Sequence, residues 1–433
     1  MGDVELHFGL APLRSVYRCS THILDLNQDI MLRLYDYLID LTDRVRLACT
    51  APKLGEAFRM WARKQRQILD VEDLETMKLP EMINFFMWAG PFIKVLHVNC
   101  DWYEKESLVV EFIAEYCFNL EEIYYTNVTD DFHFRTIMSR MKHLKRITVN
   151  CLDAEDVLSF DLEPNQGLEY FELINGCYTG EHLCGFPKLH TLILRNCLLW
   201  NYWAFGIPLR TLRLLNLDDC SFEVMNDSLY GKIAECCVNL EELHFSGCDT
   251  HFEVIAQLPK LKRCTLKTWG SSNELNIGFL ATLAEKKMGS NLTHLHLSGQ
   301  FEISNEHARV LGQLQSLQEL RWSSNDVLED DHFKFFNDLS VLESFGMSFC
   351  GRVTDVGIMR LLRKCGQLKL IDLKDCSQIT NDFVLNAIGC LAKPSPRRHL
   401  VINVLGTKIK ESLLTSIEYL APLNNVKLNF VHE

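Results

Sequence analysis

Residues 342–391 read LESFGMSFCGRVTDVGIMRLLRKCGQLKLIDLKDCSQITNDFVLNAIGCL. One phrase occurs twice here, starting at Leu342 and at Leu368: apolar, two residues, apolar, one residue, apolar, two residues, cysteine. Alternate side chains of a strand point to opposite faces, so the phrase predicts a short strand whose apolar side chains point inward. A helical pattern follows each copy. Thr354 and Asp355 are possible N-cap residues of the first helix, and Thr380 or Asn381 starts the second. The stretch therefore predicts two successive strand-plus-helix units.

The phrase recurs along most of the chain, at a spacing of about 25 residues. Leucine-rich repeats have this pattern and a spacing of roughly 20 to 29 residues. We therefore expect residues 93–433 to form an α/β solenoid of about 12–13 repeats, with a curved parallel sheet on the concave side and helices on the convex side. The other copies begin at Ile93, Leu120, Leu144, Leu168, Leu189, Leu212, Leu240, Leu261, Leu292 and Leu317.

The composition restricts the kinds of partner. The chain has 433 residues and a net charge of −13, and this acidic balance argues against nucleic acid as a partner. No run of about 18 apolar residues occurs, so no membrane span is expected. Residues 1–22, an N-terminal extension, lack a secretory pattern, and the 17 cysteines are therefore expected as reduced thiols within the core. We expect a cytoplasmic or nuclear protein.

The segment before the repeats carries three helical patterns. Residues 23–70 predict a first helix capped by Asn27 or Asp29, a second over about residues 43–49, and a third from Lys53 to about Leu69. Residues 71–92 are expected to link this unit to the solenoid or to cap it. The first helix has Ile30, Leu34, Tyr37 and Leu38 on one face, the second buries Val45, Leu47 and Ala48, and the third presents Leu54, Phe58, Trp61 and Ile68.

Two resemblances carry a functional implication. The helix starts Val353-Thr354-Asp355 and Ile379-Thr380-Asn381, each following a cysteine, resemble the cysteine-containing subtype of leucine-rich repeats. Residues 23–70 resemble a diverged F-box, although Asn27 replaces the usual proline and no tryptophan follows Cys49 at the usual short distance. The F-box matches are Leu26-Asn27, Leu32, Leu34-Tyr35, Tyr37-Leu38 and Ala48-Cys49.

The resemblance implies a non-catalytic substrate-recognition subunit of a ubiquitin ligase built from an Skp adaptor, a cullin and an F-box protein. The F-box would dock on the Skp adaptor, and the concave face of the repeats would bind a protein substrate. An alternative is an interaction scaffold whose N-terminal helices only cap the solenoid. The adaptor-binding residues implied are Leu26, Ile30, Leu34, Tyr37, Leu38, Val45 and Cys49.

Substrate contacts are expected from side chains that point out of the strands between the inward leucines. These side chains are polar and of mixed sign, which suits a folded protein better than a phosphate-rich surface. The candidates are Arg195, His244, Arg263, Lys267, His294, His296, Arg321, Asp372 and Lys374.

Other motifs give no reason to expect catalysis or a cofactor. His294 and His296 share one side of a strand, but His244 is two strands away, at roughly 10 Å, too far to complete a zinc site. Glycine-rich phosphate loops and the G-x-S-x-G motif are absent from the sequence. The aromatic cluster from Trp200 to Phe205 has two open interpretations, packing against the convex side or anchoring a partner.

Overall fold

The structure is a computed structural model that divides into two compact units, Met1–Ile93 and Lys94–Glu433. It describes residues 22–99, 106–128, 137, 140–152, 166–178, 183–199, 209–222, 228–246, 252–267, 273–274, 277–285, 291–299, 301–325, 327–392, 398–417, 419–420 and 425–430. The predictions for the N-terminal extension up to residue 21, for the core position of Cys248 and for residues 200–205 lie outside these residues.

The first unit contains the three predicted helices and a fourth. They are α1 (Gln28–Tyr37), α2 (Leu41–Cys49), α3 (Pro52–Gln65) and α4 (Leu79–Ala89), with short 3-10 turns η1 (Ile23–Asp25), η2 (Val71–Leu74) and η3 (Gly90–Phe92) and the strand β1 (Ile68–Asp70). Asn27 caps α1 by accepting the backbone N–H of Ile30 at 2.9 Å. Pro52 occupies the first turn of α3, where a missing N–H costs nothing.

The core of this unit differs from the sequence prediction at several positions. Helix α1 buries Met31 and Tyr35, whereas the predicted face is half-buried at Leu34 and exposed at Ile30 and Tyr37. Tyr35 packs edge-on against Phe58 and donates its hydroxyl to the Leu54 carbonyl at 2.8 Å, which satisfies the buried oxygen.

The third helix is shorter than the sequence pattern predicts. It ends at Gln65, and Ile68 lies exposed in β1 because the chain has already become extended there. The predicted core positions Leu54, Phe58 and Trp61 of α3 are buried, as are Val45 and Ala48 of α2, whereas Leu47 is half-buried.

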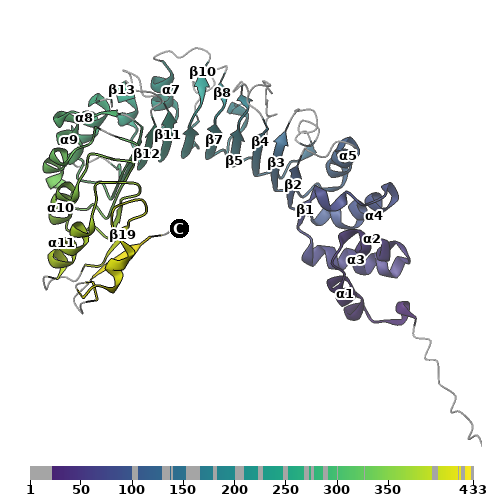
Figure 1. The fold of residues 1–433 in the computed structure, drawn as a ribbon. Helices are drawn as coiled ribbons and strands as arrows, with labels where there is room; N and C mark the ends of the chain where they lie inside the picture. The colour runs from purple at the N-terminus through teal and green to yellow at the C-terminus, as the bar shows by residue number, and fades with distance from the viewer. Residues whose placement is uncertain are drawn as a thin grey trace, which may run out of the picture. The chain divides into compact units, whose positions relative to one another are not determined.

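The second unit contains a long parallel sheet, and every predicted phrase supplies one of its strands (Figure 1). The strands lie side by side in chain order, so each repeat contacts mainly its neighbours. They are β2 (Val95–Asn99), β3 (Glu122–Val128), β4 (Arg146–Cys151), β5 (Tyr170–Ile174), β7 (Thr191–Arg195), β9 (Leu214–Leu217), β11 (Glu242–Ser246), β12 (Arg263–Lys267), β14 (His294–Ser298), β16 (Glu319–Ser323), β17 (Ser344–Ser348), β18 (Leu370–Asp372), β19 (Leu400–Asn403) and β20 (Val426–Asn429).

Helices cover the outer side of this curved sheet (Figure 1). In the described part of the chain, these connections contain either an α-helix or a 3-10 segment. The α-helices are α5 (Glu106–Tyr116), α7 (Ser228–Cys236), α8 (Ile277–Glu285), α9 (Asn305–Gly312), α10 (Asp355–Lys364) and α11 (Asn381–Leu391), and the 3-10 turns are η4 (Leu183–Gly185), η6 (Phe252–Gln257), η7 (Asp330–Asp338) and η8 (Glu411–Thr415).

Small side sheets continue the stack where the chain leaves the main strands. One joins β6 (Cys177–Tyr178), β8 (Leu198–Leu199) and β10 (Ser221–Phe222), and another joins β13 (Asn273–Glu274) and β15 (Phe301–Glu302). Asn196 and Asp375 adopt left-handed backbone angles at such exits, with φ of 51° and 56°. Asn and Asp tolerate this conformation better than most residues.

The cysteines after the strands are largely core residues, as predicted. Cys151, Cys177, Cys197, Cys350 and Cys376 are buried as free thiols. Cys220 is half-buried instead. Burial raises the pKa of the Cys376 thiol to about 12, so this thiol stays protonated and packs as a small apolar side chain.

The helix caps are linked from one repeat to the next. Of the residues that the sequence offers at these helix starts, Thr354 and Thr380 are the N-caps of α10 and α11. Asp330 accepts the backbone N–H and hydroxyl of Thr354, and Asp355 accepts the same two groups of Thr380 at 2.8 and 2.6 Å. Each carboxylate therefore fixes the start of the following helix.

Parallel strands in sequence order, inward leucines and helices on the opposite side define a leucine-rich-repeat solenoid that is open rather than closed into a barrel. Within the described part of the chain, no helix is both long and apolar enough to cross a membrane.

Candidate functional site

The strand register brings predicted substrate residues together on the inner face of the sheet. His244 on β11, Thr265 on β12, His296 on β14 and Arg321 on β16 are aligned partners on adjacent strands. A second row, two residues earlier on each strand, aligns Glu242, Arg263, His294 and Glu319. Because neighbouring strands lie about 4.8 Å apart, these two rows form one continuous polar surface.

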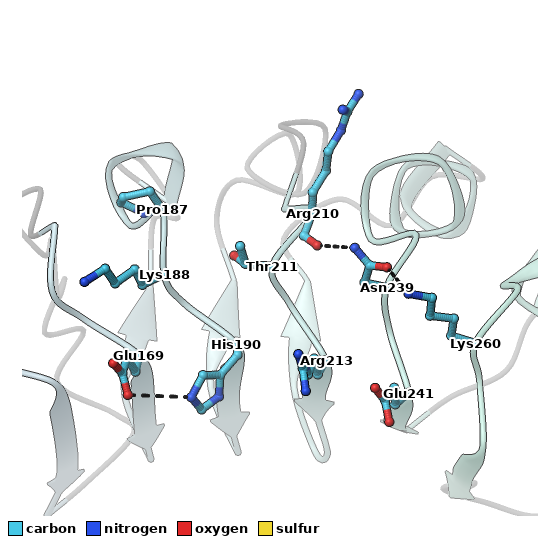
Figure 2. Close-up of a pocket in the computed structure, with 10 residues that line it drawn as sticks. All are labelled: Glu169, Pro187, Lys188, His190, Arg210, Thr211, Arg213, Asn239, Glu241 and Lys260. Atoms are coloured by element: carbon cyan, nitrogen blue, oxygen red, sulfur yellow. Dashed lines mark hydrogen bonds and ion pairs between the residues drawn. The ribbon is translucent and has the colours of Figure 1, made fainter.

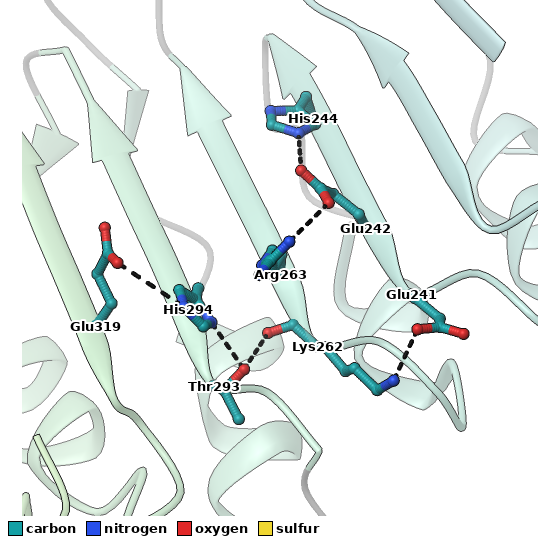
Figure 3. Close-up of polar contacts among 8 residues, drawn as sticks. All are labelled: Glu241, Glu242, His244, Lys262, Arg263, Thr293, His294 and Glu319. Atoms are coloured by element: carbon teal, nitrogen blue, oxygen red, sulfur yellow. Dashed lines mark hydrogen bonds and ion pairs between the residues drawn. The ribbon is translucent and has the colours of Figure 1, made fainter. Parts of the chain in front are cut away.

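The first part of this surface is organised by Glu242. Its carboxylate contacts His244 Nε2 at 2.8 Å and Arg263 Nη1 at 3.4 Å (Figure 3). The contact to His244 joins alternate residues of one strand, and that to Arg263 joins neighbouring strands. One carboxylate therefore orients two of the predicted residues.

Glu319 organises the other part. It accepts a hydrogen bond from His296 Nε2 at 2.9 Å, contacts Arg321, and lies 3.8 Å from His294 Nε2. The hydrogen bond from His296, together with the Arg321 charge, lowers the pKa of Glu319 to about 2. The carboxylate is thus ionised at neutral pH and holds its basic neighbours in place.

His294 lies between these two carboxylates in sequence register. Partial burial lowers the pKa of His294, and the nearby Glu319 charge opposes the effect without cancelling it. The ring is therefore neutral at pH 7. Its Nδ1 lies 2.8 Å from the hydroxyl of Thr293. Figure 3 marks this contact with a dashed line.

Between the two carboxylates the inner face is hollowed by about 290 Å³. Such a volume accommodates a side chain of a partner rather than a large ligand. Among the described residues no cluster of three or more His, Cys, Asp or Glu side chains is arranged to hold a metal ion. The hollow is lined by Glu242, His244, Arg263, Cys264, Thr265, His294, His296 and Glu319.

The remaining predicted residues lie apart from this hollow. Arg195 ends β7 and pairs with Glu172 at 2.7 Å, and Lys267 ends β12 and pairs with Asp218 at 2.9 Å. Asp372 is the last residue of β18. Lys374 was expected on a strand but lies in the turn beyond β18, where its ammonium sits 5.9 Å from the centre of the Phe349 ring.

The sequence prediction omitted Glu242, one of the two carboxylates that organise the surface. Glu242 and Glu319 occupy the same phrase position as Arg263 and His294, so the phrase alone shows that they point outward. Only the strand order shows which bases they contact.

The first unit has a separate apolar surface on α1 and the residues after it. Ile30 is 44 % exposed, Tyr37 83 % and Ile39 96 %, while Leu26, Leu34 and Leu38 are half-buried. Cys49 is exposed as well. Val45 has no accessible surface, so this predicted adaptor-binding residue packs within the unit and is not exposed to a partner.

Comparison with known proteins adds only loose likenesses. No family model matches the chain, and no curated protein matches it. Similar solved structures include a leucine-rich-repeat protein of Leptospira interrogans (15% identity, TM-score 0.41, covering 86% of this chain and 98% of the other). A chain of the yeast Rad7–Elc1 complex is also similar (14% identity, TM-score 0.40, covering 86% of this chain and 91% of the other). So is a chain of a TLR13–single-stranded RNA complex (12% identity, TM-score 0.43, covering 86% of this chain and 59% of the other). The assignment of the fold rests on the strand register instead.

Proposed function

We propose that this chain is the substrate-recognition subunit of a ubiquitin ligase of the Skp–cullin–F-box type. The helices of the first unit dock on the Skp adaptor, and the inner face of the repeats binds a protein substrate. The chain performs no bond chemistry itself. It acts by holding the two partners on one polypeptide, which raises the effective concentration of the substrate near the ligase.

Adaptor docking is supported mainly by the two faces of α1, one buried in the core and one exposed. Met31 and Tyr35 supply its contribution to the core, yet Ile30 and Tyr37 remain exposed, followed by Ile39. Exposed apolar side chains grouped on a short helix favour a protein interface, because covering them releases water. The F-box resemblance of the same residues supports an Skp adaptor as the occupant.

The substrate half rests on the inner face. Glu242 and Glu319 hold histidine and arginine side chains in fixed positions around the hollow, so less side-chain freedom is lost when a partner binds. Both signs of charge are present, which favours a folded protein with complementary charges.

The adaptor half is tested by titrating the purified chain with purified Skp adaptor. Ile30→Asp places a negative charge in the first turn of α1 and Tyr37→Lys a positive charge in its last turn, so both suit the helix dipole and spare the helix. Each variant is expected to weaken adaptor binding by about tenfold or more, as loss of an interface anchor does.

Ile417→Lys is the matched control, since Ile417 is 87 % exposed but belongs to the second unit. It is expected to leave adaptor affinity unchanged. Equal adaptor binding by wild type, both α1 variants and the control contradicts the ligase function. In that case the alternative, an interaction scaffold with a helical cap, is retained.

A further inference from the structure

The edge where the chain enters the strands carries a continuous row of charged and polar side chains. The residue before each strand donates its backbone N–H to the carbonyl of its equivalent in the preceding repeat. The row therefore runs along the sheet as Lys94, Glu121, Lys145, Glu169, His190, Arg213, Glu241, Lys262, Thr293, Gln318, Glu343 and Lys369.

Most charges in this row are neutralised by their neighbours. Glu121 pairs with Lys94 at 3.1 Å and with Lys145 at 2.7 Å. The pairs Glu241–Lys262 and Glu343–Lys369 both measure 2.7 Å. Alternating signs account for this pairing, as in a cross-strand charge ladder.

The alternation is interrupted at Arg213. Its neighbours are His190, which lies 3.9 Å from Glu169, and Glu241, which is already paired with Lys262. The hydrogen bond from Lys262 also lowers the pKa of Glu241, so that carboxylate stays ionised and engaged. Arg213 thus forms no ion pair within the described part of the chain, and nor does the nearby Lys188.

A hollow of about 710 Å³ lies at this interruption (Figure 2). Its floor is the row Glu169, His190, Arg213 and Glu241, and Lys188 and Thr211 lie above it. This volume is within the usual range for binding sites and is larger than the inner-face hollow.

One side of the hollow is held by hydrogen bonds. Asn239 donates its side-chain amide to the Arg210 carbonyl at 2.6 Å and accepts from the Lys260 ammonium at 2.7 Å. Lys260 is therefore held at the rim, whereas the Arg210 guanidinium points away from the hollow (Figure 2). Because Lys260 is already held in place, little side-chain freedom is lost when its ammonium contacts a ligand.

The local charge is opposite to that of the chain. Lys188, Arg213 and Lys260 carry positive charge at the hollow, while its two carboxylates, Glu169 and Glu241, face basic neighbours. The whole chain carries a net charge of −13. Cations that form no ion pair, in a hollow of an acidic protein, favour a short anionic segment, because the field is concentrated there.

We propose that this hollow binds an acidic segment of a partner polypeptide, whose carboxylate or phosphate oxygens contact Arg213 and Lys188. Glu169 and Glu241 bound the cations on both sides, so a short run of negative charge fits but a long polyanion is repelled. The geometry therefore favours a peptide over a nucleic acid. The inference does not depend on adaptor docking, since every residue involved belongs to the second unit.

The test measures peptide affinity by fluorescence anisotropy. The probes are a short peptide rich in Asp and Glu, its phosphoserine counterpart, a neutral Asn and Gln counterpart, and single-stranded DNA of equal charge. The double variant Lys188→Gln, Arg213→Gln is compared with the control Lys145→Gln, Lys369→Gln. Both change the net charge equally, but the control lysines are already paired along the same edge.

The acidic peptides are expected to bind wild type and the control alike and to lose about tenfold in affinity on the hollow variant. Raising the salt concentration should weaken wild-type binding in parallel. Whichever acidic peptide binds more tightly identifies carboxylate or phosphate as the preferred group.

Three results overturn the inference: equal loss in the control, equal binding of the neutral peptide, or tighter binding of the DNA. Adaptor titration of the same variants should be unchanged. The peptide titration therefore tests the hollow, and the adaptor titration tests the ligase function, independently of each other.

Discussion

Asp355 of one repeat holds Thr380, the N-cap of α11 in the next repeat, by two hydrogen bonds. In Asp355→Ala, the two hydrogen bonds to the Thr380 N–H at 2.8 Å and hydroxyl at 2.6 Å are lost. Hydrogen bonds to a charged group contribute roughly 1.5–3 kcal/mol each, and partial solvation of these two reduces their contribution. We expect a net loss of about 2 kcal/mol in the local stability of α11.

The loss should be confined to the neighbouring repeat, because repeats contact mainly their neighbours. Hydrogen exchange followed by mass spectrometry is the assay. Amides of α11, Asn381–Leu391, should exchange roughly 30-fold faster, which corresponds to about 2 kcal/mol. Amides of β11 to β14 should be unaffected.

Asp331→Ala is the matched control, because its carboxylate is 72 % exposed and only pairs with Arg360 at 3.3 Å. Such a surface pair contributes about 0.5 kcal/mol or less. The reasoning is refuted if α11 exchange in Asp355→Ala changes no more than in the control, or if acceleration extends equally to β11.

Three further outcomes are expected. Glu319→Gln should lower the free energy of unfolding by about 2 kcal/mol at pH 7, because the pKa of Glu319 in the folded protein, about 2, lies below the ordinary value near 4.3. Denaturant titrations should show this difference from wild type vanishing as the pH falls from about 4.5 to 2. Iodoacetamide at mildly alkaline pH should modify exposed Cys49 in the native protein but not buried Cys365 or Cys376, as peptide mapping will show; modification of either buried thiol before unfolding contradicts the core assignment. Tyr35→Phe removes the hydrogen-bond donor to the Leu54 carbonyl and should cost about 1 kcal/mol in the stability of the first unit. Calorimetry should show this as a lower unfolding temperature. An unchanged unfolding temperature would mean that the hydrogen bond does not contribute to stability.

The sequence by itself determined the repeat fold. Leucines at fixed phrase positions have to be buried together, and only strands stacked in order bury all of them, so the phrase alone places the strands that follow Leu342 and Leu368. The sequence also located the starts of α10 and α11 to within one residue, since N-capping depends on residues close in the chain. The outward position of His244, His296 and Arg321 followed from the period of two.

The tertiary structure alone decided what those outward residues contact. Glu319 reaches His296 from a neighbouring strand, and Lys188 and Arg213 line one hollow from different repeats. In the first unit, packing against α3 selected Met31 and Tyr35 for the core and left Ile30 and Tyr37 exposed, although the helical pattern permitted either face. The physical reason is distance along the chain. Periodicity indicates which way a side chain points, whereas contacts across strands depend on loop lengths that vary from repeat to repeat.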